Sequence, residues 1–306
     1  MSIFTGHMVK LDDVVISDVT AQKVMMGIET NRDPANLATA TYASVKKAQP
    51  MFGFTSRQVA AVLDKGVSAN PYQNLASWTS GYTQYMAERV TGGVYASGST
   101  HRSFAVPAGM MICRNVSCGQ EEDAVIQADI LPISSNGTTL PFTIADNAAL
   151  PTFDPDDDQR FTIGPWTVGN VALTGITRVS VDFGITEQWV AGDGFPIPTR
   201  CSIRQYLPTI RIEGFTAGWL AASIIPALGA AGTQANTYGW FRKRAKGSTF
   251  VAAATAEHIK FSMACFAHIE NTDSSGNEDA PATLVLEGID DGTNAVVTID
   301  TTSAIS

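Results

Sequence analysis

The stretch TRVSVDFGIT, Thr177 to Thr186, alternates apolar and polar residues along its length. Successive side chains of a strand point to opposite faces, so this period of two predicts one half-buried β-strand. The inward face would carry Val179, Val181, Phe183 and Ile185. A near-copy occurs earlier, in AQKVMMGIET (Ala21 to Thr30), where Gly27-Ile28 stands in place of Gly184-Ile185.

A nearly constant offset relates the first part of the chain to the second. An offset of 157 aligns Phe4-Thr5 with Phe161-Thr162. With one residue inserted, an offset of 158 aligns SVKKAQPMFGF (Ser44 to Phe54) with SIRQYLPTIRI (Ser202 to Ile212), including both prolines. Unrelated matches would need different offsets, so we interpret the chain as a tandem duplication of a unit of about 150 residues, a typical domain size.

The boundary between the two copies is PTFDPDDDQR, Pro151 to Arg160. Its Pro and Asp content and lack of periodicity predict an exposed linker. The aspartates do not fit a calcium-binding EF-hand loop, which needs Gly at position 6 and Glu at position 12; counted from Asp154, the chain has Gln159 and Pro165 there. We therefore predict a first β domain over 1–153, an acidic linker over 154–160 and a second β domain over 161–306.

Each copy is predicted to be mainly β, so the chain would hold two tandem homologous β-sandwich or barrel domains. Each domain would have one short flanking α-helix, which the first copy places in TSRQVAAVLDKG (Thr55 to Gly66) and the second at Ala217 to Ile224. Thr55 or Ser56 would cap the first helix and Gly66 would end it.

Two strands are predicted at the end of each copy, joined as a hairpin. In the first copy they are Val125–Leu131 and Leu140–Ile144, around Asn136-Gly137, and in the second Leu284–Ile289 and Val296–Ile299, around Asp291-Gly292. Dipeptides of this kind are strong hairpin signals.

Long irregular stretches are expected in both copies, over Val67–His101 and Pro226–Glu257. Loops of this length are uncommon unless they are functional, disordered or bound to a partner. Both contain large apolar side chains, which are costly to leave in water. The candidate residues for a subunit or ring interface are Tyr72, Leu75, Trp78, Tyr82, Tyr85, Tyr238, Trp240 and Phe241. The alternative is that they pack onto their own domain.

The charge pattern argues against a protein that grips nucleic acid. The formal net charge is −9, and the one basic cluster is FRKRAKG (Phe241 to Gly247). Arg242, Lys243 and Arg244 could contact phosphates, but an acidic protein favours another hypothesis. They would contact an acidic patch on a neighbouring subunit, the candidate residues being Asp154, Asp156, Asp157 and Asp158.

No enzymatic or metal-binding motif emerges from the sequence. It contains no phosphate-binding glycine loop, no G-x-S-x-G and no H-E-x-x-H. Its four cysteines, Cys113, Cys118, Cys201 and Cys265, lack the paired spacing of a zinc site and are expected to be reduced buried thiols. We expect no catalytic residue, cofactor or metal. A secretory signal is also not expected, and the most apolar stretch, 217–231, is too short to span a membrane.

Several segments together resemble the major tail tube proteins of long-tailed, siphovirus-like bacteriophages. The segments are ITRVSVDFGITEQWVAGDGFPIPT (176–199), IRQYLPTIRIEG (203–214), YGWFRKRAKGSTF (238–250) and ASGSTHR (96–102), and the resemblance as a whole extends over about half of the chain. In that family the unit is a β-sandwich with a flanking helix and a long loop. Six copies usually form a ring, and the rings stack around a channel for DNA.

The resemblance implies a virion structural protein and not an enzyme. Two tube-like units in one chain would let three chains form a ring with pseudo-sixfold symmetry, because head-to-tail contacts close when the rotation permits. The expected partners are further copies of the chain, the tape measure, tail terminator and distal tail proteins, and DNA that passes through without specific binding. The protein would be assembled in the host cytoplasm and located in the virion tail. The alternatives are another β-rich phage structural protein (baseplate, decoration or receptor-binding) and, further off, an enzyme.

Overall fold

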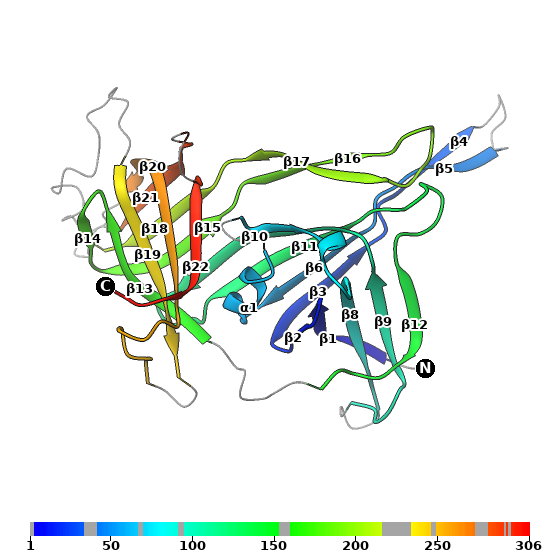
Figure 1. The fold of residues 1–306 in the computed structure, drawn as a ribbon, viewed down its shortest axis with the longest axis horizontal. Coiled ribbons are helices and arrows are strands. Elements are labelled where there is room, and N and C mark those ends of the chain that lie inside the picture. The colour runs from blue at the N-terminus through cyan, green and yellow to red at the C-terminus, as the bar shows by residue number, and fades with distance from the viewer. Residues whose placement is uncertain are drawn as a thin grey trace.

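The fold comes from a computed structural model, which describes residues 3–33, 42–66, 70–90, 95–152, 160–215, 234–245, 249–272, 281–290, 292 and 295–306. Within these ranges the chain is mainly β, as predicted, with one short α-helix, α1 (Val59–Leu63), and one 3-10 helix, η1 (Leu75–Ser77). The strands form large antiparallel sheets in an elongated molecule (Figure 1).

Among the described residues, the N-terminal half contains twelve strands. They are β1 (Ile3–Leu11), β2 (Val14–Ile16), β3 (Val19–Met25), β4 (Ile28–Asp33), β5 (Tyr42–Ala48), β6 (Met51–Ser56), β7 (Tyr72–Asn74), β8 (Tyr82–Arg89), β9 (His101–Val106), β10 (Gly109–Gly119), β11 (Val125–Pro132) and β12 (Thr143–Ala148).

The C-terminal half contains ten strands among the described residues. They are β13 (Arg160–Val168), β14 (Val171–Leu173), β15 (Ile176–Asp182), β16 (Ile185–Val190), β17 (Arg200–Tyr206), β18 (Thr209–Gly214), β19 (Gln234–Arg244), β20 (His258–Thr272), β21 (Ala282–Gly288) and β22 (Val297–Ser303).

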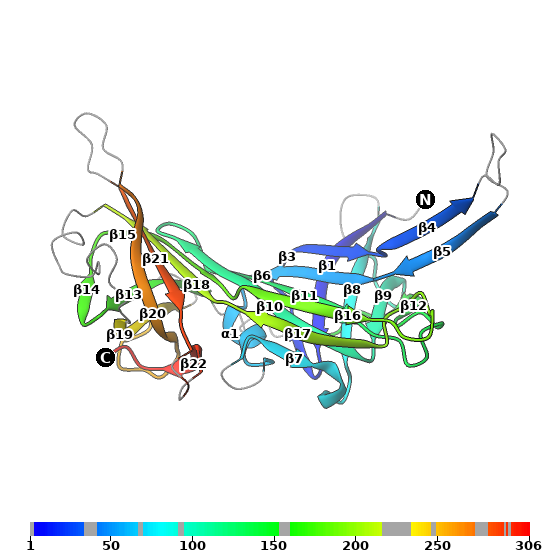
Figure 2. The ribbon, with the colours of Figure 1, turned by 90° about the horizontal axis from the view of Figure 1, so that it is seen from above.

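One sheet runs through both halves of the molecule. It has 13 strands, of which β14-β13-β19-β20-β21-β18-β15-β10-β11-β6-β3 follow one another, while β22 pairs with β20 and β7 with β10. A five-stranded sheet, β12-β9-β8-β1-β2, crosses it in the N-terminal half (Figure 2). The strand pairs β4-β5 and β16-β17 form separate two-stranded hairpins.

The strand pairings of the N-terminal half recur in the C-terminal half. The run β3-β6-β11-β10 corresponds to β15-β18-β21-β20, and β2-β1-β8-β9-β12 corresponds to β14-β13-β19-β20-β22. The registers agree as well, since Val24 lies opposite Phe52 and Val181 lies opposite Ile210, at the offsets that align the sequences. β20 replaces both β9 and β10 because it continues without the break that separates those two strands.

Buried apolar side chains fill the space between the two sheets of the N-terminal half. Phe52 of β6 is fully buried and contacts the rings of Tyr82, Phe104 and Phe142 at centroid distances of 6.1, 5.9 and 5.3 Å. Such edge and tilted contacts add to the free energy of burying the rings. The C-terminal half has an aromatic cluster of its own, formed by Trp166, Phe241 and Phe261.

The stretch Thr177–Thr186 is two strands and not one, so that prediction is wrong. β15 ends at Asp182 and β16 begins at Ile185, with Gly184 between them at φ 56°. Ala21–Thr30 breaks in the same way at Gly27, at φ 54°. A positive φ is open to Gly at little cost, and here it turns the chain out of the sheet although the apolar alternation continues through it.

The predicted hairpins at the end of each copy are also wrong. β11 pairs with β10 and β6, whereas β12 pairs with β9, so the two strands lie in different sheets. β21 and β22 likewise both pair with β20 and not with each other. The strands exist, but the turn at Asn136-Gly137 serves a crossover between sheets.

The stretches predicted to be irregular contain strands. Val67–His101 includes β7, η1 and β8, and Pro226–Glu257 includes β19. The predicted first helix exists as α1, but its N-cap is Gln58 without a side-chain cap hydrogen bond, because Thr55 and Ser56 belong to β6. The predicted second helix, 217–224, lies outside the described residues.

Candidate functional site: a self-association surface

The two halves of the chain are joined by one pair of neighbouring strands. β10 of the N-terminal half pairs antiparallel with β15 of the C-terminal half, from Asn115 opposite Asp182 to Gly119 opposite Arg178. On the core side of this pair, the apolar side chains of Val116 and Val181 are buried. The junction therefore continues both the backbone hydrogen bonding and the core from one half to the other.

An arginine reinforces this junction at a β-bulge. Arg114 falls where the register between β10 and β11 shifts, and a bulge re-aims the side chain that it carries. Its Nε donates to Asp129 of β11 at 2.7 Å, and its two terminal nitrogens donate to the carboxylate of Glu187 in β16, both at 2.9 Å. One terminal nitrogen also donates to the carbonyl of Ile185 at 2.9 Å. We call these residues the Arg114 clamp.

The clamp is partly shielded from solvent, and its charges perturb one another. The side chains of Arg114, Asp129 and Glu187 are 23%, 11% and 21% exposed. Burial acts to raise the pKa of Glu187, but the hydrogen bonds and charge of Arg114 outweigh burial and hold that pKa below its ordinary value. Bidentate arginine–carboxylate pairs of this kind fix geometry as well as charge.

The β16–β17 hairpin lies along the N-terminal half like an arm (Figures 1 and 2). Its connecting loop is held by backbone hydrogen bonds from Ala48 to the carbonyl of Pro196 and from Ser134 to that of Pro198, both 2.8 Å. At the base of the arm, the ring of Tyr206 stacks edge-on against Tyr72 at 6.5 Å.

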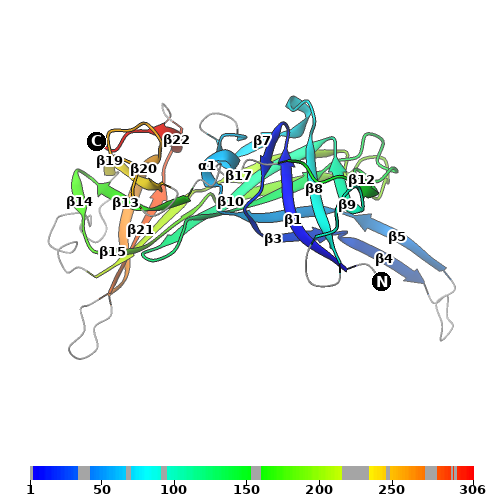
Figure 3. The same ribbon diagram turned by 90° about the horizontal axis from the view of Figure 1, so that it is seen from below.

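The N-terminal half presents equivalent elements that have no such cover. β3 occupies the position of β15, yet it pairs only with β6 and ends the large sheet in the part of the chain that the structure describes. The β4–β5 hairpin extends away from the body (Figures 1 and 3). Ile28 at its base is 57% exposed, whereas the equivalent Ile185 is 7% exposed.

One face of the large sheet is polar across both halves. Cross-strand pairs share a face, and the rows opposite to the core include Asn115–Asp182–Thr209–Glu287 and Lys23–Gly53–Asp129. The charged members of this face carry both signs, and Arg211 is ion-paired with Glu270 as Arg114 is with its carboxylates. The sheet is thus amphipathic: one face lies in the core, and the other is polar, with Asp182 and Glu287 exposed and Asp129 shielded within the Arg114 clamp.

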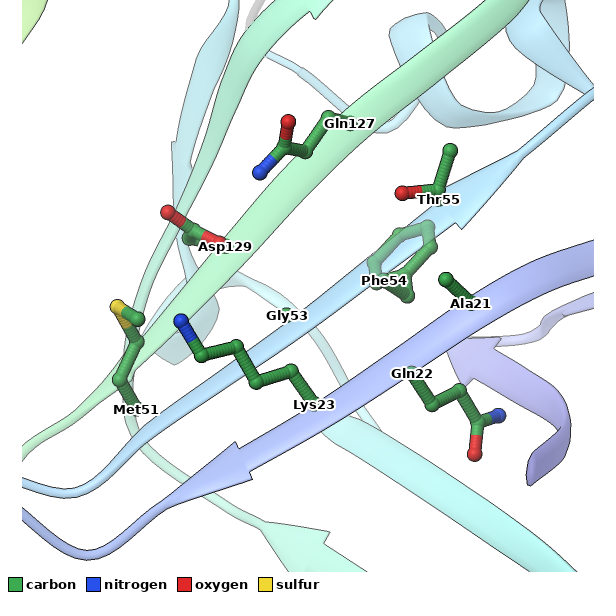
Figure 4. Close-up of a pocket in the computed structure, with 9 residues that line it drawn as sticks. All are labelled: Ala21, Gln22, Lys23, Met51, Gly53, Phe54, Thr55, Gln127 and Asp129. Carbon is green, nitrogen blue, oxygen red and sulfur yellow. The ribbon is translucent and has the colours of Figure 1, made fainter. Parts of the chain in front are cut away.

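A hollow of about 220 Å³ lies on β3, β6 and β11 (Figure 4). Lys23 and Asp129 flank it, and Gly53 leaves its floor open. In the C-terminal half the position of Gly53 is taken by Arg211, whose side chain is ion-paired with Glu270. The hollow is therefore a local difference between the halves at the exposed sheet edge.

The predicted interface residues of the first copy lie mostly in the chain's own core. Leu75 and Tyr82 are fully buried, and Trp78 and Tyr72 pack against the core. Tyr82 also donates from its hydroxyl to Gln84 at 2.9 Å. Tyr85 on β8 is partly buried, and burial raises its pKa. Leu75 and Tyr82 thus pack within their own chain, and the part of these residues in a subunit interface stays a prediction.

The aromatic residues of the second copy and the basic cluster lie together on β19. Trp240 and Phe241 are buried, and Tyr238 packs edge-on against Trp240 at 5.1 Å. Of the cations, Arg242 lies 4.6 Å from the ring centre of Phe250, and Lys243 donates to Glu257 at 2.7 Å.

Arg244 lies near an acidic residue of the other half of the chain. Its guanidinium is 3.7 Å from Asp123, which also accepts a hydrogen bond of 2.6 Å from Arg160. The proposed acidic partners, Asp154, Asp156, Asp157 and Asp158, lie outside the described residues. The structure places Arg244 beside an acidic group, but a group in its own chain.

The described residues contain no group of three or more His, Cys, Asp or Glu side chains that could hold a metal ion. The four cysteines are free, and burial raises the pKa of Cys113 and of Cys201 to about 12. In the described part of the chain, no helix has both the length and the apolar character to cross a membrane. Comparison with protein-family models and with curated proteins found no match.

The Arg114 clamp is the part of the site that sequence reasoning missed. Arg114 and Glu187 are separated by 73 residues, and neither lies in a motif. Glu270 stands at the position of Arg114 by the strand registers, but the sequence offsets of 157 and 158 do not align these two residues, so the repeat alignment alone carries no signal for the clamp.

Proposed function

We propose that the chain consists of two copies of one β-sandwich unit, the first with α1 on its flank, and that it is a self-assembling structural protein. The agreement between the strand pairings and registers of the two halves supports the repeat. Closely matching backbones that differ at charged positions are expected of duplicated units that have diverged.

The observation that carries the proposal is the β10–β15 junction. It is a head-to-tail contact between unlike edges of two similar units, and contacts of this type generate rings or filaments when repeated. The equivalent edges are the part of β20 beyond Cys265, where its pairing with β19 ends, and β3 at the other end of the molecule. Repeating the junction between two copies pairs Asn271 of one copy with Met25 of the next, and Thr272 with Val24.

Closure of this contact by three chains yields a ring with pseudo-sixfold symmetry. The polar face of the large sheet then lines the ring, and stacked rings form the tube of a phage tail, through which DNA is ejected. The ion-paired state of Arg114 and Arg211 on that face favours passage over tight phosphate binding. The partners are other copies of the chain and the tape measure, terminator and distal tail proteins.

Electron microscopy of the purified full chain tests the proposal. Rings or hollow tubes are expected in negative stain, with an initiating tail protein added if the chain alone stays dispersed. A particle that remains a monomer at all concentrations, with and without that protein, contradicts the proposal.

Cysteine cross-linking tests the strand pairing itself. Oxidation of a Met25→Cys, Asn271→Cys variant is expected to produce covalent multimers, because directly opposite strand positions lie within disulfide range. The matched control is Ala21→Cys with Asn271→Cys, whose positions are four strand residues out of register. Equal yields of multimers from both pairs contradict this pairing.

A further inference from the structure

The β4–β5 hairpin is built in the same way as the β16–β17 arm. Ile28 lies opposite Ala48 as Ile185 lies opposite Tyr206, and both hairpins have a register shift at the same step. Each leaves the sheet at a positive-φ glycine whose carbonyl accepts a backbone hydrogen bond, from Gln49 at 3.1 Å and from Leu207 at 3.2 Å. We call this hairpin the free arm.

The two arms differ in what covers them. Trp189 and Ile203 of the β16–β17 arm pack against the core. On the free arm the position of Ile203 is taken by Val45, which is 50% exposed, and Tyr42 is 60% exposed. Val45 and Tyr42 lie on opposite faces of β5, so the feature that marks the free arm as uncovered is the exposure of Val45 at the position where Ile203 packs against the core.

The partner of the free arm follows from where the β16–β17 arm lies. That arm rests on β10 and β11, whose equivalents in the C-terminal half are β20 and β21. These strands lie at the opposite end of the molecule from β4 and β5 (Figures 1 and 2). The free arm therefore cannot reach the equivalent surface of its own chain, and only another copy can supply it.

The charges of the two surfaces complement each other. Glu270 stands on β20 where Arg114 stands on β10, so an acid replaces a base there; Glu270 is ion-paired with Arg211 of β18, and an arginine from the arm would share its carboxylate. The free arm has Thr30 in place of Glu187 and carries exposed Arg32 two residues further along the same face. An arginine on the arm and a glutamate on the sheet thus replace the glutamate and arginine of the junction within the chain.

We propose that the free arm of one copy docks on β20 and β21 of a second copy, as the β16–β17 arm docks on β10 and β11 within the chain. This inference rests on the proposed head-to-tail assembly. The docked arm would add its own contact surface to the paired strand edges, so the interface between copies would be larger than the strand pairing alone.

Charged substitutions on the free arm test this inference in the full chain. Val45→Asp is expected to raise the concentration needed for assembly by about tenfold or more, because the buried valine contact is worth at least that factor. Leu140→Asp is the matched control, since Leu140 is 58% exposed against 50% for Val45 and belongs to neither β4 nor β5. Sedimentation velocity measures the assembled fraction, and circular dichroism checks that both variants fold.

Photo-cross-linking identifies the docking surface directly. A benzophenone amino acid placed at position 45 is expected to attach to peptides of β20 or β21 of another copy. If the wild-type chain assembles but Val45→Asp behaves as Leu140→Asp, and the cross-links map elsewhere, the docking inference is wrong while the proposed function stands. If the wild-type chain does not assemble at all, the proposed function itself fails.

Discussion

The guanidinium of Arg114 in β10 and the carboxylate of Glu187 in β16 are joined by two hydrogen bonds of 2.9 Å. Through this pair, and through Asp129, the bulged strand of the N-terminal half holds the arm of the C-terminal half. The contact ties the two halves at a point where the backbone ladder between β10 and β15 has just ended.

Replacing Arg114 by Met is expected to destabilise the protein. The variant keeps most of the volume but leaves two partly buried carboxylates without their donor, which costs about 1–3 kcal/mol. Urea unfolding at neutral pH measures the loss. Arg178→Met, on the exposed face of β15, is the control and should stay within about 0.5 kcal/mol of wild type. Equal effects of the two substitutions contradict a specific role for the clamp.

The clamp also makes stability depend on acid pH. The pKa of Glu187 lies below its ordinary value of 4.5 in the folded chain, so the unfolded chain takes up this proton first as pH falls. The stabilisation is complete above about pH 4.5 and is lost as pH drops through the lowered pKa. Glu187→Gln should flatten this part of the plot of unfolding free energy against pH. An unchanged slope assigns the acid sensitivity to other groups.

Gly184 is expected to tolerate no side chain. Its φ is 56°, and a β-carbon there would lie 1.9 Å from the carbonyl oxygen of Leu207. Gly184→Ala should cost about 1–3 kcal/mol or more through backbone strain. Gly192, where a β-carbon meets nothing within 4 Å, is the control position. Thermal unfolding compares the two alanine variants. Similar melting temperatures would contradict the strained turn assigned to Gly184.

His258 is predicted to act as a neutral structural acceptor. It is fully buried, its Nδ1 accepts from the backbone of Lys243 at 3.0 Å, and its Nε2 lies 3.1 Å from the carbonyl of Ala252. The first contact requires an unprotonated Nδ1, so the proton resides on Nε2 and is donated to Ala252. His258→Phe should lose about 1–3 kcal/mol by leaving a buried N–H unpaired.

The control for His258 is His268 on the same strand. Its Nδ1 has no hydrogen-bond partner among the described residues, so His268→Phe removes no bond from that atom. If both variants lose a similar free energy of unfolding in urea, ring packing and not the hydrogen bond accepted by Nδ1 decides the contribution of His258.

Much of the strand content of this fold could be predicted from the sequence, because alternation reports burial along one strand. The inward positions Val179 and Val181 are buried as expected. Alternation does not reveal where the chain changes direction, however. The apolar pattern continues through the turn at Gly184, so the sequence did not predict that turn. Alternation also does not report partners, and the pairing of β12 with β9 instead of β11 depends on contacts distant in sequence.

The candidate site was harder to predict for the same reason. Tyr82 and Trp240 were correctly recognised as too apolar to remain in water, but burial alone does not distinguish a core from an interface. β8 was missed because YTQYMAER has few β-branched residues, and its place between β1 and β9 fixes it as a strand. The clamp needs three residues that meet only after the sheet has formed.

In a ring of identical single units, every interface between neighbours is formed by the same two side chains, because each position is encoded once. Under the proposed duplication, the clamp position is encoded separately as Arg114 and as Glu270, so a mutation at either codon leaves the other unaltered. The junction inside the chain and the edge that remains open can consequently diverge under separate selection. The junction within the chain can then evolve to be tight while the contact between chains evolves to be reversible.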